Sequence, residues 1–214
     1  MNDLVKISLR KLKAKKILNP ELDLRIMLNN SKKKRKEIFL STFNQEDINL
    51  EKFNRFLKRR LNHEPIAKII NKKNFWKDDF FVNKNVLDPR PETELIIEEC
   101  INLIENKDER IRVLEIGTGS GCLSISLAKE FINSKILAID ICKKAIEISK
   151  KNILYYNCNN QINSKVLDFK KITNTYDLIV SNPPYLSKIE YSKVERNIRD
   201  FEPKMALYGG EDGL

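Results

Sequence analysis

The first third of the chain repeats apolar residues at the spacing of amphipathic helices. Asn19-Pro20 supplies a cap followed by a proline at the first helical position. The residues after it include an apolar stripe: Leu22, Leu24, Ile26, Met27 and Leu28. A second helix is predicted over residues 48–61. Its apolar positions recur at steps of three and four: Leu50, Phe53, Phe56, Leu57 and Leu61. We therefore expect a small helical domain over residues 1–74.

The pattern changes between residues 66 and 87, where aromatic and β-branched residues replace the helical spacing. Phe75-Trp76 and Phe80-Phe81-Val82 are typical of short strands, and Asn83-Lys84 stands where a turn would lead to Val86-Leu87. This predicts a β-hairpin linker over residues 75–91. A helix is expected to follow, from Glu92 to about Glu105.

From residue 112 onward, apolar strand-like segments alternate with helical ones. Strands are predicted at 112–116, 135–141, 165–167 and 176–181, and helices at 122–131 and 143–156. Strands that alternate with helices need crossover connections, which indicate a parallel sheet covered by helices on both faces. The predicted fold class is α/β, with a Rossmann-like, doubly wound domain over residues 92–214. Ligands of such domains bind outside the carboxyl ends of the strands.

Composition excludes several classes of protein. The chain has 214 residues, of which 41% are hydrophobic and 33% charged, as in a soluble protein with a sizeable core. Neither a membrane-spanning run nor the apolar stretch of a signal peptide is seen, so a cytoplasmic protein is expected. The four cysteines form no C-x-x-C pair and His63 is the only histidine. We therefore expect no metal site, buried thiols and a surface or interdomain histidine.

Positive charge is concentrated at one end of the chain. Residues 1–74 carry 20 basic and 8 acidic side chains, whereas residues 75–214 carry 20 and 22. Two basic runs, over residues 11–16 and 32–36, lack interleaved aromatic residues, which favours solvated helix faces over a phosphate-binding surface. A nucleic-acid partner is therefore not favoured, although the asymmetry leaves it open.

Three segments at predicted strand ends indicate an adenosine-bearing cofactor. A glycine loop follows the first strand of the α/β domain and leads directly into a helix, whose free N–H groups favour an anionic group. Asp140 ends the second strand, where an acidic side chain accepts from ribose hydroxyls. Asp168-Phe169 follows the third strand and offers an acceptor and a ring face for adenine. S-adenosylmethionine fits this set. The loop residues are Gly117, Thr118, Gly119, Ser120 and Gly121.

The sharpest motif is Asn182-Pro183-Pro184-Tyr185 at the end of the fourth predicted strand. Two successive prolines restrict the backbone and force Asn182 to be extended, so its side chain and nearby carbonyls are held in one geometry. These oxygens accept from a planar NH2 group and orient its nitrogen toward a sulfonium methyl. Tyr185 is expected to stack on the planar group or to form its wall. Asn182, Pro183 and Tyr185 are therefore the candidate catalytic residues, and Asn182 also faces the cofactor.

These motifs together resemble methyltransferases that modify planar sp2 nitrogens, and one further segment narrows the choice. Pro89-Arg90-Pro91-Glu92-Thr93-Glu94 resembles a block of the release factor glutamine methyltransferases, the PrmC/HemK family. The segments Arg199–Pro203 and Ala206–Leu214 are similar to the same family. Residues Asn71, Asn74 and Asp88 depart from its usual pattern.

The resemblance implies a reaction and a partner. S-adenosylmethionine would bind at Gly117–Gly121, Asp140 and Asp168-Phe169, and Asn182–Tyr185 would hold the substrate amide. The implied substrate is the glutamine of the Gly-Gly-Gln motif in class I peptide-chain release factors, methylated at N5. Residues 1–74 would recognise that partner. Arg90 is implied to bind substrate, and it shapes the cleft together with Glu94 unless both are purely structural.

Two other interpretations remain. An adenine-N6 or guanine-N2 methyltransferase acting on DNA or RNA would need the same amide acceptors, because its substrate also presents a planar NH2. A binding module that docks a release factor without turnover is the second. It is motivated by the last residues, Gly213-Leu214, which stand where the family continues with further strands. We expect the methyltransferase domain to lack these strands and to leave the fourth strand at an open edge.

Overall fold

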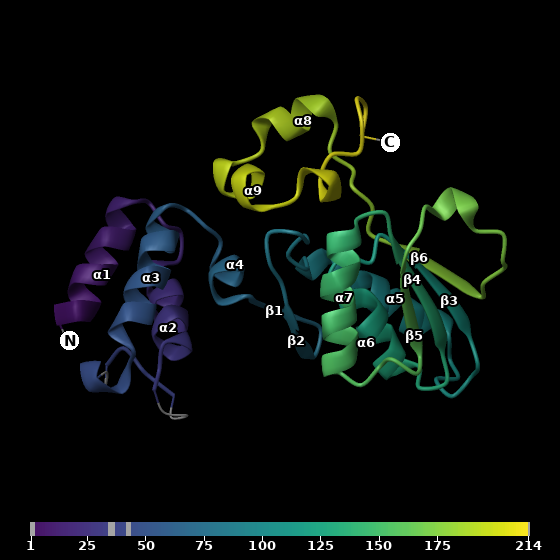
Figure 1. Ribbon diagram of the computed structural model, residues 1–214, viewed down its shortest axis with the longest axis horizontal. Coiled ribbons are helices and arrows are strands. Elements are labelled where there is room, and N and C mark those ends of the chain that lie inside the picture. Colours follow the sequence, from purple (N-terminus) through teal and green to yellow (C-terminus); the bar gives the residue numbers. More distant parts are fainter. Residues whose placement is uncertain (1–2, 34–36, 42–43, 214) are drawn as a thin grey trace. The chain divides into compact units, whose positions relative to one another are not determined.

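The computed structural model describes residues 3–33, 37–41 and 44–213 (Figure 1). The chain forms two compact units, Met1–Asn71 and Lys72–Leu214, each with its own hydrophobic core. Residues 34–36 of the second basic run lie outside the described residues. In the described part of the chain, no helix combines the length and apolar character that crossing a membrane requires.

The first unit is helical, as predicted. Its helices are α1 (Asp3–Ala14), α2 (Pro20–Asn30), α3 (Leu50–Leu61) and α4 (Ile66–Ile70). Pro20 occupies the start of α2, and the side chain of Asn49 caps α3 by accepting from the Lys52 N–H at 2.9 Å. The buried faces are narrower than the predicted stripes, because Leu22 and Leu50 stay 47% and 38% exposed. The core of this unit includes Leu12, Leu24, Met27, Leu28 and Phe53.

Cations of this unit serve two different purposes. Arg60 donates to the buried Asp23 at 2.6 Å and so joins α3 to α2, while Arg59 binds the Glu64 carboxylate through two nitrogens. The cationic side chains of residues 11–16, in contrast, are exposed at the end of α1 and after it, as expected for a solvated face. His63 is exposed as well.

A β-hairpin opens the second unit, but its turn lies seven residues before the predicted one. Strands β1 (Lys72–Phe75) and β2 (Asp78–Phe81) are antiparallel and are joined at Trp76-Lys77. Trp76 adopts a φ of 54°, the left-handed region that two-residue hairpin turns need. Large aromatic residues are unusual there, which is why the sequence pointed instead to Asn83-Lys84. Asn83 makes a local turn, accepting from the Asn85 N–H at 2.9 Å.

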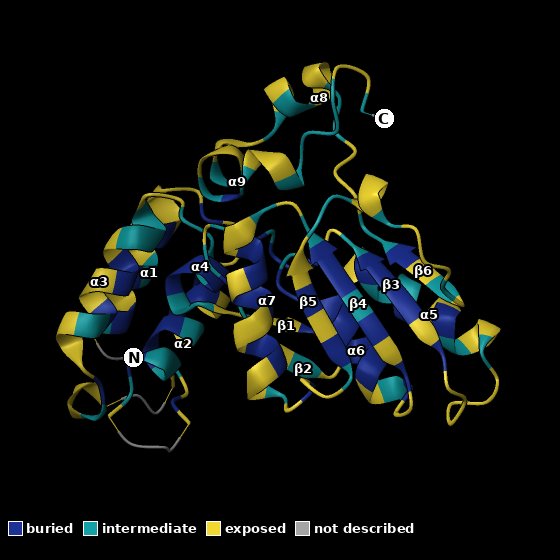
Figure 2. Cartoon of the chain, turned by 45° about the vertical axis from the view of Figure 1, so that its right-hand side comes forward, coloured by how far each residue is buried: buried dark blue, intermediate teal, exposed yellow. Residues whose placement is uncertain are grey.

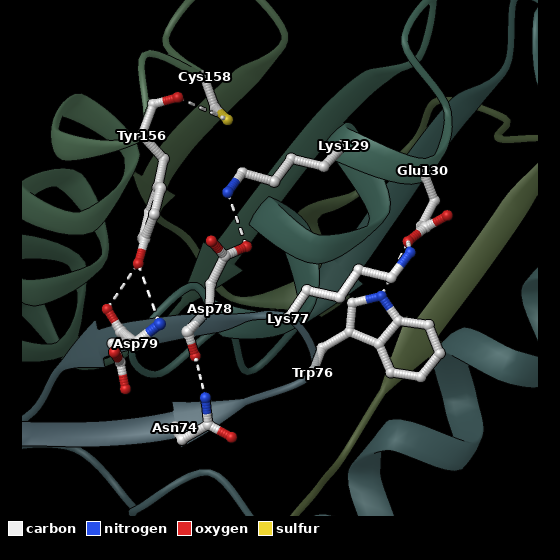
Figure 3. A network of polar contacts seen from close by, with 9 residues as sticks. All are labelled: Asn74, Trp76, Lys77, Asp78, Asp79, Lys129, Glu130, Tyr156 and Cys158. Atoms are coloured by element: carbon white, nitrogen blue, oxygen red, sulfur yellow. Dashed lines mark hydrogen bonds and ion pairs between the residues drawn. The ribbon is translucent and has the colours of Figure 1, made fainter.

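The hairpin belongs to the second unit and is not a free linker. Its Phe75 and Phe80 are fully buried in the core of that unit, so the boundary lies after Asn71 and not after residue 74. Polar contacts add to this packing (Figure 3). Trp76 Nε1 donates to Glu130 at 2.8 Å, and the Tyr156 hydroxyl donates to the Asp79 carbonyl at 2.6 Å.

Four parallel strands form the sheet of the second unit. These are β3 (Arg112–Ile116), β4 (Lys135–Asp140), β5 (Ile162–Val166) and β6 (Leu178–Ser181), in the order β5-β4-β3-β6. The order reverses at β3, because β4 and β5 extend the sheet to one side and β6 pairs on the other. This is the switch point at which doubly wound sheets bind ligands. β6 lies at an edge of the described sheet, as expected.

Helices α5 (Glu94–Leu103), α6 (Cys122–Glu130) and α7 (Lys143–Tyr155) belong to the same unit, with α6 and α7 packed on the sheet (Figure 2). Helical cover of both faces was expected, but between β5 and β6 the described chain has only a 3-10 helix, Phe169–Lys171. Ile179 of β6 is accordingly 59% exposed. Three cysteines are buried as predicted, whereas Cys142 is half-buried.

After β6 the chain forms two short helices that the sequence did not predict. They are α8 (Lys188–Lys193) and α9 (Arg196–Phe201). Ser187 and Glu190 form a reciprocal capping box that begins α8. The segment beyond α9 supplies Pro203, Met205 and Ala206 to the cavity described next.

Candidate active site

A cavity of about 440 Å³ lies at the carboxyl ends of the strands. It is lined by the segments that follow all four strands and by the Pro-Arg-Pro block. The lining segments are residues 85–90, 115–120, 139–142, 167–170 and 181–184. The sequence-predicted site residues are thus brought together, with the exceptions of Gly121 and Tyr185, which do not line the cavity.

The glycine loop after β3 has the backbone that its sequence predicts. Gly117, Gly119 and Gly121 have φ values of 77°, 55° and 79°, which side chains disfavour. A Cβ added at Gly121 would lie 2.9 Å from Ser149 Oγ, so this glycine allows the loop to approach α7. At Gly117 an added Cβ would meet nothing within 4 Å, which leaves open space over the loop. Helix α6 begins directly afterwards.

Asp140 fastens the glycine loop to the end of β4. Its Oδ2 accepts from the Gly119 N–H at 3.0 Å and its Oδ1 from the Cys142 N–H at 2.8 Å. Each carboxylate oxygen has a further lone pair, so Asp140 retains the capacity to accept hydroxyl groups from a ligand.

Asp168 and Phe169 follow β5 and line the same cavity. Asp168 Oδ1 accepts from the Lys170 N–H at 3.0 Å and begins the 3-10 helix, while the ring of Phe169 is 52% exposed. An acceptor and a ring face therefore stand next to each other at the cavity wall.

A buried carboxylate beneath the loop was missed by the sequence reasoning. Glu115 of β3 is 3% exposed and accepts from the hydroxyls of Thr118, at 2.6 Å, and Ser124. Burial raises its pKa to about 7, against the lowering effect of the two hydroxyl bonds. A charged residue within a buried strand, next to a glycine loop, was the signal that could have revealed it.

The Asn-Pro-Pro-Tyr segment leaves β6 at the other side of β3. Asn182 Nδ2 donates to Thr93 Oγ1 at 2.9 Å, and Ser181 Oγ donates to the Ile116 carbonyl at 2.9 Å. Thr93 precedes α5, but its side chain does not cap that helix. Since the nitrogen of the Asn182 amide is engaged, its Oδ1 is the end of the side chain left to accept. Tyr185 is 68% exposed.

Arg90 and Glu94 differ in their placement. Arg90 lines the cavity and lies 3.5 Å from Glu202, whose buried carboxylate also accepts from the Asp88 N–H at 3.2 Å. Glu202 was not singled out as a functional residue, yet it ties two walls of the cavity together. Glu94 does not line the cavity. It accepts from the Trp76 N–H at 2.7 Å, and so its role is to hold the hairpin.

Sequence comparison assigns both units to known families. Residues 92–201 match the methyltransferase small domain, and residues 3–70 match the PrmC N-terminal domain. The chain is 38% identical to the release factor glutamine methyltransferase of Buchnera aphidicola subsp. Baizongia pistaciae, over 95% of this chain and 74% of that protein. The chain belongs to the release factor glutamine methyltransferase family. The cofactor of its methyltransferase domain is S-adenosylmethionine.

Some similar proteins are much longer than this chain. A bifunctional methyltransferase of Rickettsia prowazekii is 38% identical over 91% of this chain, but the match covers 42% of that protein. The chain thus spans less than half the length of such relatives. Among solved structures, a protein from Methanococcus maripaludis described as an S-adenosyl-L-methionine-dependent methyltransferase is 31% identical, covering 57% of each chain with a TM-score of 0.38. That overlap is too low to add to the fold described above.

Proposed function

We propose that this protein transfers a methyl group from S-adenosylmethionine to the side-chain amide nitrogen, N5, of the glutamine in the Gly-Gly-Gln motif of class I peptide-chain release factors. The observation that carries the proposal is the Asn182–Thr93 hydrogen bond. It leaves an amide oxygen free to accept at the cavity that the glycine loop also lines. A primary amide is the substrate group that this arrangement suits, and the family membership points to glutamine.

The residues at the cavity fit the cofactor in three places. The open space over Gly117 and the start of α6 suit the amino-acid end, where a helix N-terminus favours a carboxylate. Asp140 would accept from ribose hydroxyls, and Asp168 with Phe169 would hold adenine. When bound, S-adenosylmethionine would supply an electrophilic methyl group on its sulfonium sulfur. Transfer to the amide nitrogen would break the sulfur–methyl bond, leave S-adenosylhomocysteine and release one amide proton to solvent.

The substrate side of the proposal rests on oxygen acceptors. Asn182 Oδ1 and the Pro183 carbonyl would accept the two N–H bonds of the glutamine amide, which fixes the direction of its nitrogen. Binding both hydrogens favours the pyramidal nitrogen formed during attack, so the acceptors act more strongly in the transition state than on the ground state. Arg90 and Pro184 would contact the peptide around that glutamine, and Tyr185 would cover it from outside the cavity.

The helical unit would recognise the release factor, whose place in translation puts the reaction in the cytoplasm. Two of its arginines, Arg59 and Arg60, are occupied by internal ion pairs, whereas the cationic residues of the first basic run are exposed. The charge of this unit therefore bears on how a partner is held and not on the chemistry.

A methyl-transfer assay tests the proposal directly. Purified chain is incubated with tritiated S-adenosylmethionine and a release factor that carries Gly-Gly-Gln, and the label is located by mass spectrometry of the tryptic peptides. We expect label on that glutamine and none when it is changed to alanine. Asn182→Ala should abolish turnover while the Kd of the cofactor stays within tenfold. Label that appears in DNA or RNA, or cofactor binding without any turnover, would refute the proposed function.

A further inference from the structure

The segment Leu207–Gly213 runs beside the residues that follow Asn182-Pro183. Its main chain is bonded to them at three places. The Leu186 N–H donates to the Leu207 carbonyl at 2.9 Å, the Gly209 N–H to the Leu186 carbonyl at 3.0 Å, and the Lys188 N–H to the Glu211 carbonyl at 3.3 Å. Leu186 and Tyr208 form a parallel β-bridge. The chain directly after the Asn182-Pro183-Pro184-Tyr185 motif, which we call the acceptor motif, is therefore paired with a segment about 20 residues further along the chain.

Two glycines in this segment allow an approach that no side chain would permit. A Cβ added at Gly209 would lie 2.7 Å from the Pro184 carbonyl oxygen. At Gly213, where φ is 87°, an added Cβ would lie 2.5 Å from the Tyr185 carbonyl oxygen and 3.0 Å from the Ser187 nitrogen. Carbon and oxygen atoms in contact usually stay at least about 3.3 Å apart. All three neighbours are backbone atoms, so the two main chains would have to separate.

These contacts also determine where the carbonyl groups of the motif are directed. The carbonyl oxygens of Pro184 and Tyr185 lie against Gly209 and Gly213. At the other end of the motif, Asn182 is held by Thr93. The four-residue motif is thus anchored at both ends, with the Pro183 carbonyl between the two anchors.

We propose that Gly209 and Gly213 are positioning residues for methyl transfer: by close main-chain packing they hold Pro184 and Tyr185, and through them the amide acceptors. This inference rests on the proposed function. Its physical basis is that a displacement of about 1 Å in a group that orients a reactant lowers the rate by up to roughly a hundredfold. The cofactor end of the cavity is built from other segments, so its affinity does not depend on the two glycines.

The experiment compares Gly209→Ala and Gly213→Ala with Glu211→Ala in the full chain. Glu211 lies in the same segment. Among the described residues its side chain makes an exposed ion pair with Lys188 at 3.1 Å and accepts a bond from the Tyr208 hydroxyl, so its loss should change little. Calorimetry with S-adenosylmethionine gives the Kd and the number of binding sites. The kcat for release-factor methylation is then expressed per binding site, which removes the effect of any unfolded fraction.

We expect the kcat per site to fall tenfold or more in both glycine variants, while their cofactor Kd stays within threefold of wild type. In Glu211→Ala, both the kcat per site and the cofactor Kd should stay within twofold of wild type. Amide exchange measured by NMR should accelerate at Leu186 in both glycine variants and at Gly209 in Gly213→Ala, because these N–H groups form the hydrogen bonds that join the two segments. A kcat per site within twofold of wild type would overturn the proposal, as would a parallel rise in the cofactor Kd. Wild-type protein that binds cofactor but leaves the release factor unlabelled would instead refute the proposed function. In that case, an unchanged rate of amide exchange at Leu186 in the glycine variants would still count against the packing role of the two glycines.

Discussion

The side-chain nitrogen of Asn182 donates to Thr93 Oγ1 at 2.9 Å, although 89 positions separate the two residues. Thr93 is 7% exposed and belongs to the Pro-Arg-Pro-Glu-Thr-Glu block, while Asn182 directly follows the edge strand β6. The bond fixes the orientation of the Asn182 amide, whose Oδ1 is its only acceptor atom. It also links the two motifs that carry the family resemblance, because Thr93 of the first motif orients Asn182 of the second.

Thr93→Val tests this relationship because valine keeps the shape of threonine and removes the hydroxyl. A neutral hydrogen bond contributes about 1 kcal/mol, so we expect methylation kcat to fall by about five- to tenfold. The cofactor Kd should not change. Thr93→Ser restores the hydroxyl and should recover activity to within threefold of wild type. Equal activity of the valine and serine variants would show that the hydroxyl does not orient Asn182.

Asp140→Asn should weaken cofactor binding. Both carboxylate oxygens accept from main-chain N–H groups, at 3.0 and 2.8 Å, and the NH2 of asparagine would face one of these donors. Hydrogen bonds to charged groups contribute about 1.5–3 kcal/mol, which corresponds to a Kd increase of roughly tenfold or more. Calorimetry measures the Kd of S-adenosylmethionine for the variant and for wild type. Asp200→Asn, which alters an exposed carboxylate of α9, is the control and should leave the Kd unchanged. Equal affinities of the two variants would contradict the role of Asp140.

We expect Glu115 to make the stability of the second unit depend on pH. Burial raises its pKa from the ordinary 4.5 to about 7, so the fold favours the protonated form. The contribution of Glu115 to the unfolding free energy is complete below pH 4.5 and is lost as the pH rises through 7. The unfolding free energy changes in total by a value on the order of 3 kcal/mol. Chemical denaturation between pH 5 and 8 should show this decline in wild type and a shallower one in Glu115→Gln. If the unfolding free energy fell equally with pH in the two proteins, Glu115 would be excluded as the cause of the decline.

Tyr156→Phe should loosen the hairpin of the second unit. The hydroxyl donates to the Asp79 carbonyl at 2.6 Å and accepts from the Asp79 N–H at 3.1 Å (Figure 3). Its removal leaves the ring packed against Phe80, so we expect a loss of about 1–2 kcal/mol in unfolding free energy and faster amide exchange at Asp79. Tyr155→Phe is the matched control, because Tyr155 is 75% exposed. A similar loss in both variants would argue against the hydroxyl bonds.

Much of this protein follows from local sequence. The helical spacing around Phe53 and Phe56, the strand and helix alternation from Arg112 onward, and the glycines at 117, 119 and 121 all reflect rules that act within a few residues. Because parallel strands present their carboxyl ends at one edge, the positions of Asp140 and Asn182 already implied a shared cavity. The sequence alone therefore determined the fold class and most of the residues at the site.

Only the tertiary structure decided how those residues are held. The Trp76-Lys77 turn depends on burying Phe75 and Phe80 against the sheet domain, which outweighs the turn preference of Asn83. The partners of Asn182, the buried Glu202 beside Arg90, and the packing of Gly209 and Gly213 on the acceptor motif join residues far apart in sequence. No local pattern encodes such pairs, because they exist only once distant main-chain segments have been brought within hydrogen-bonding or van der Waals distance.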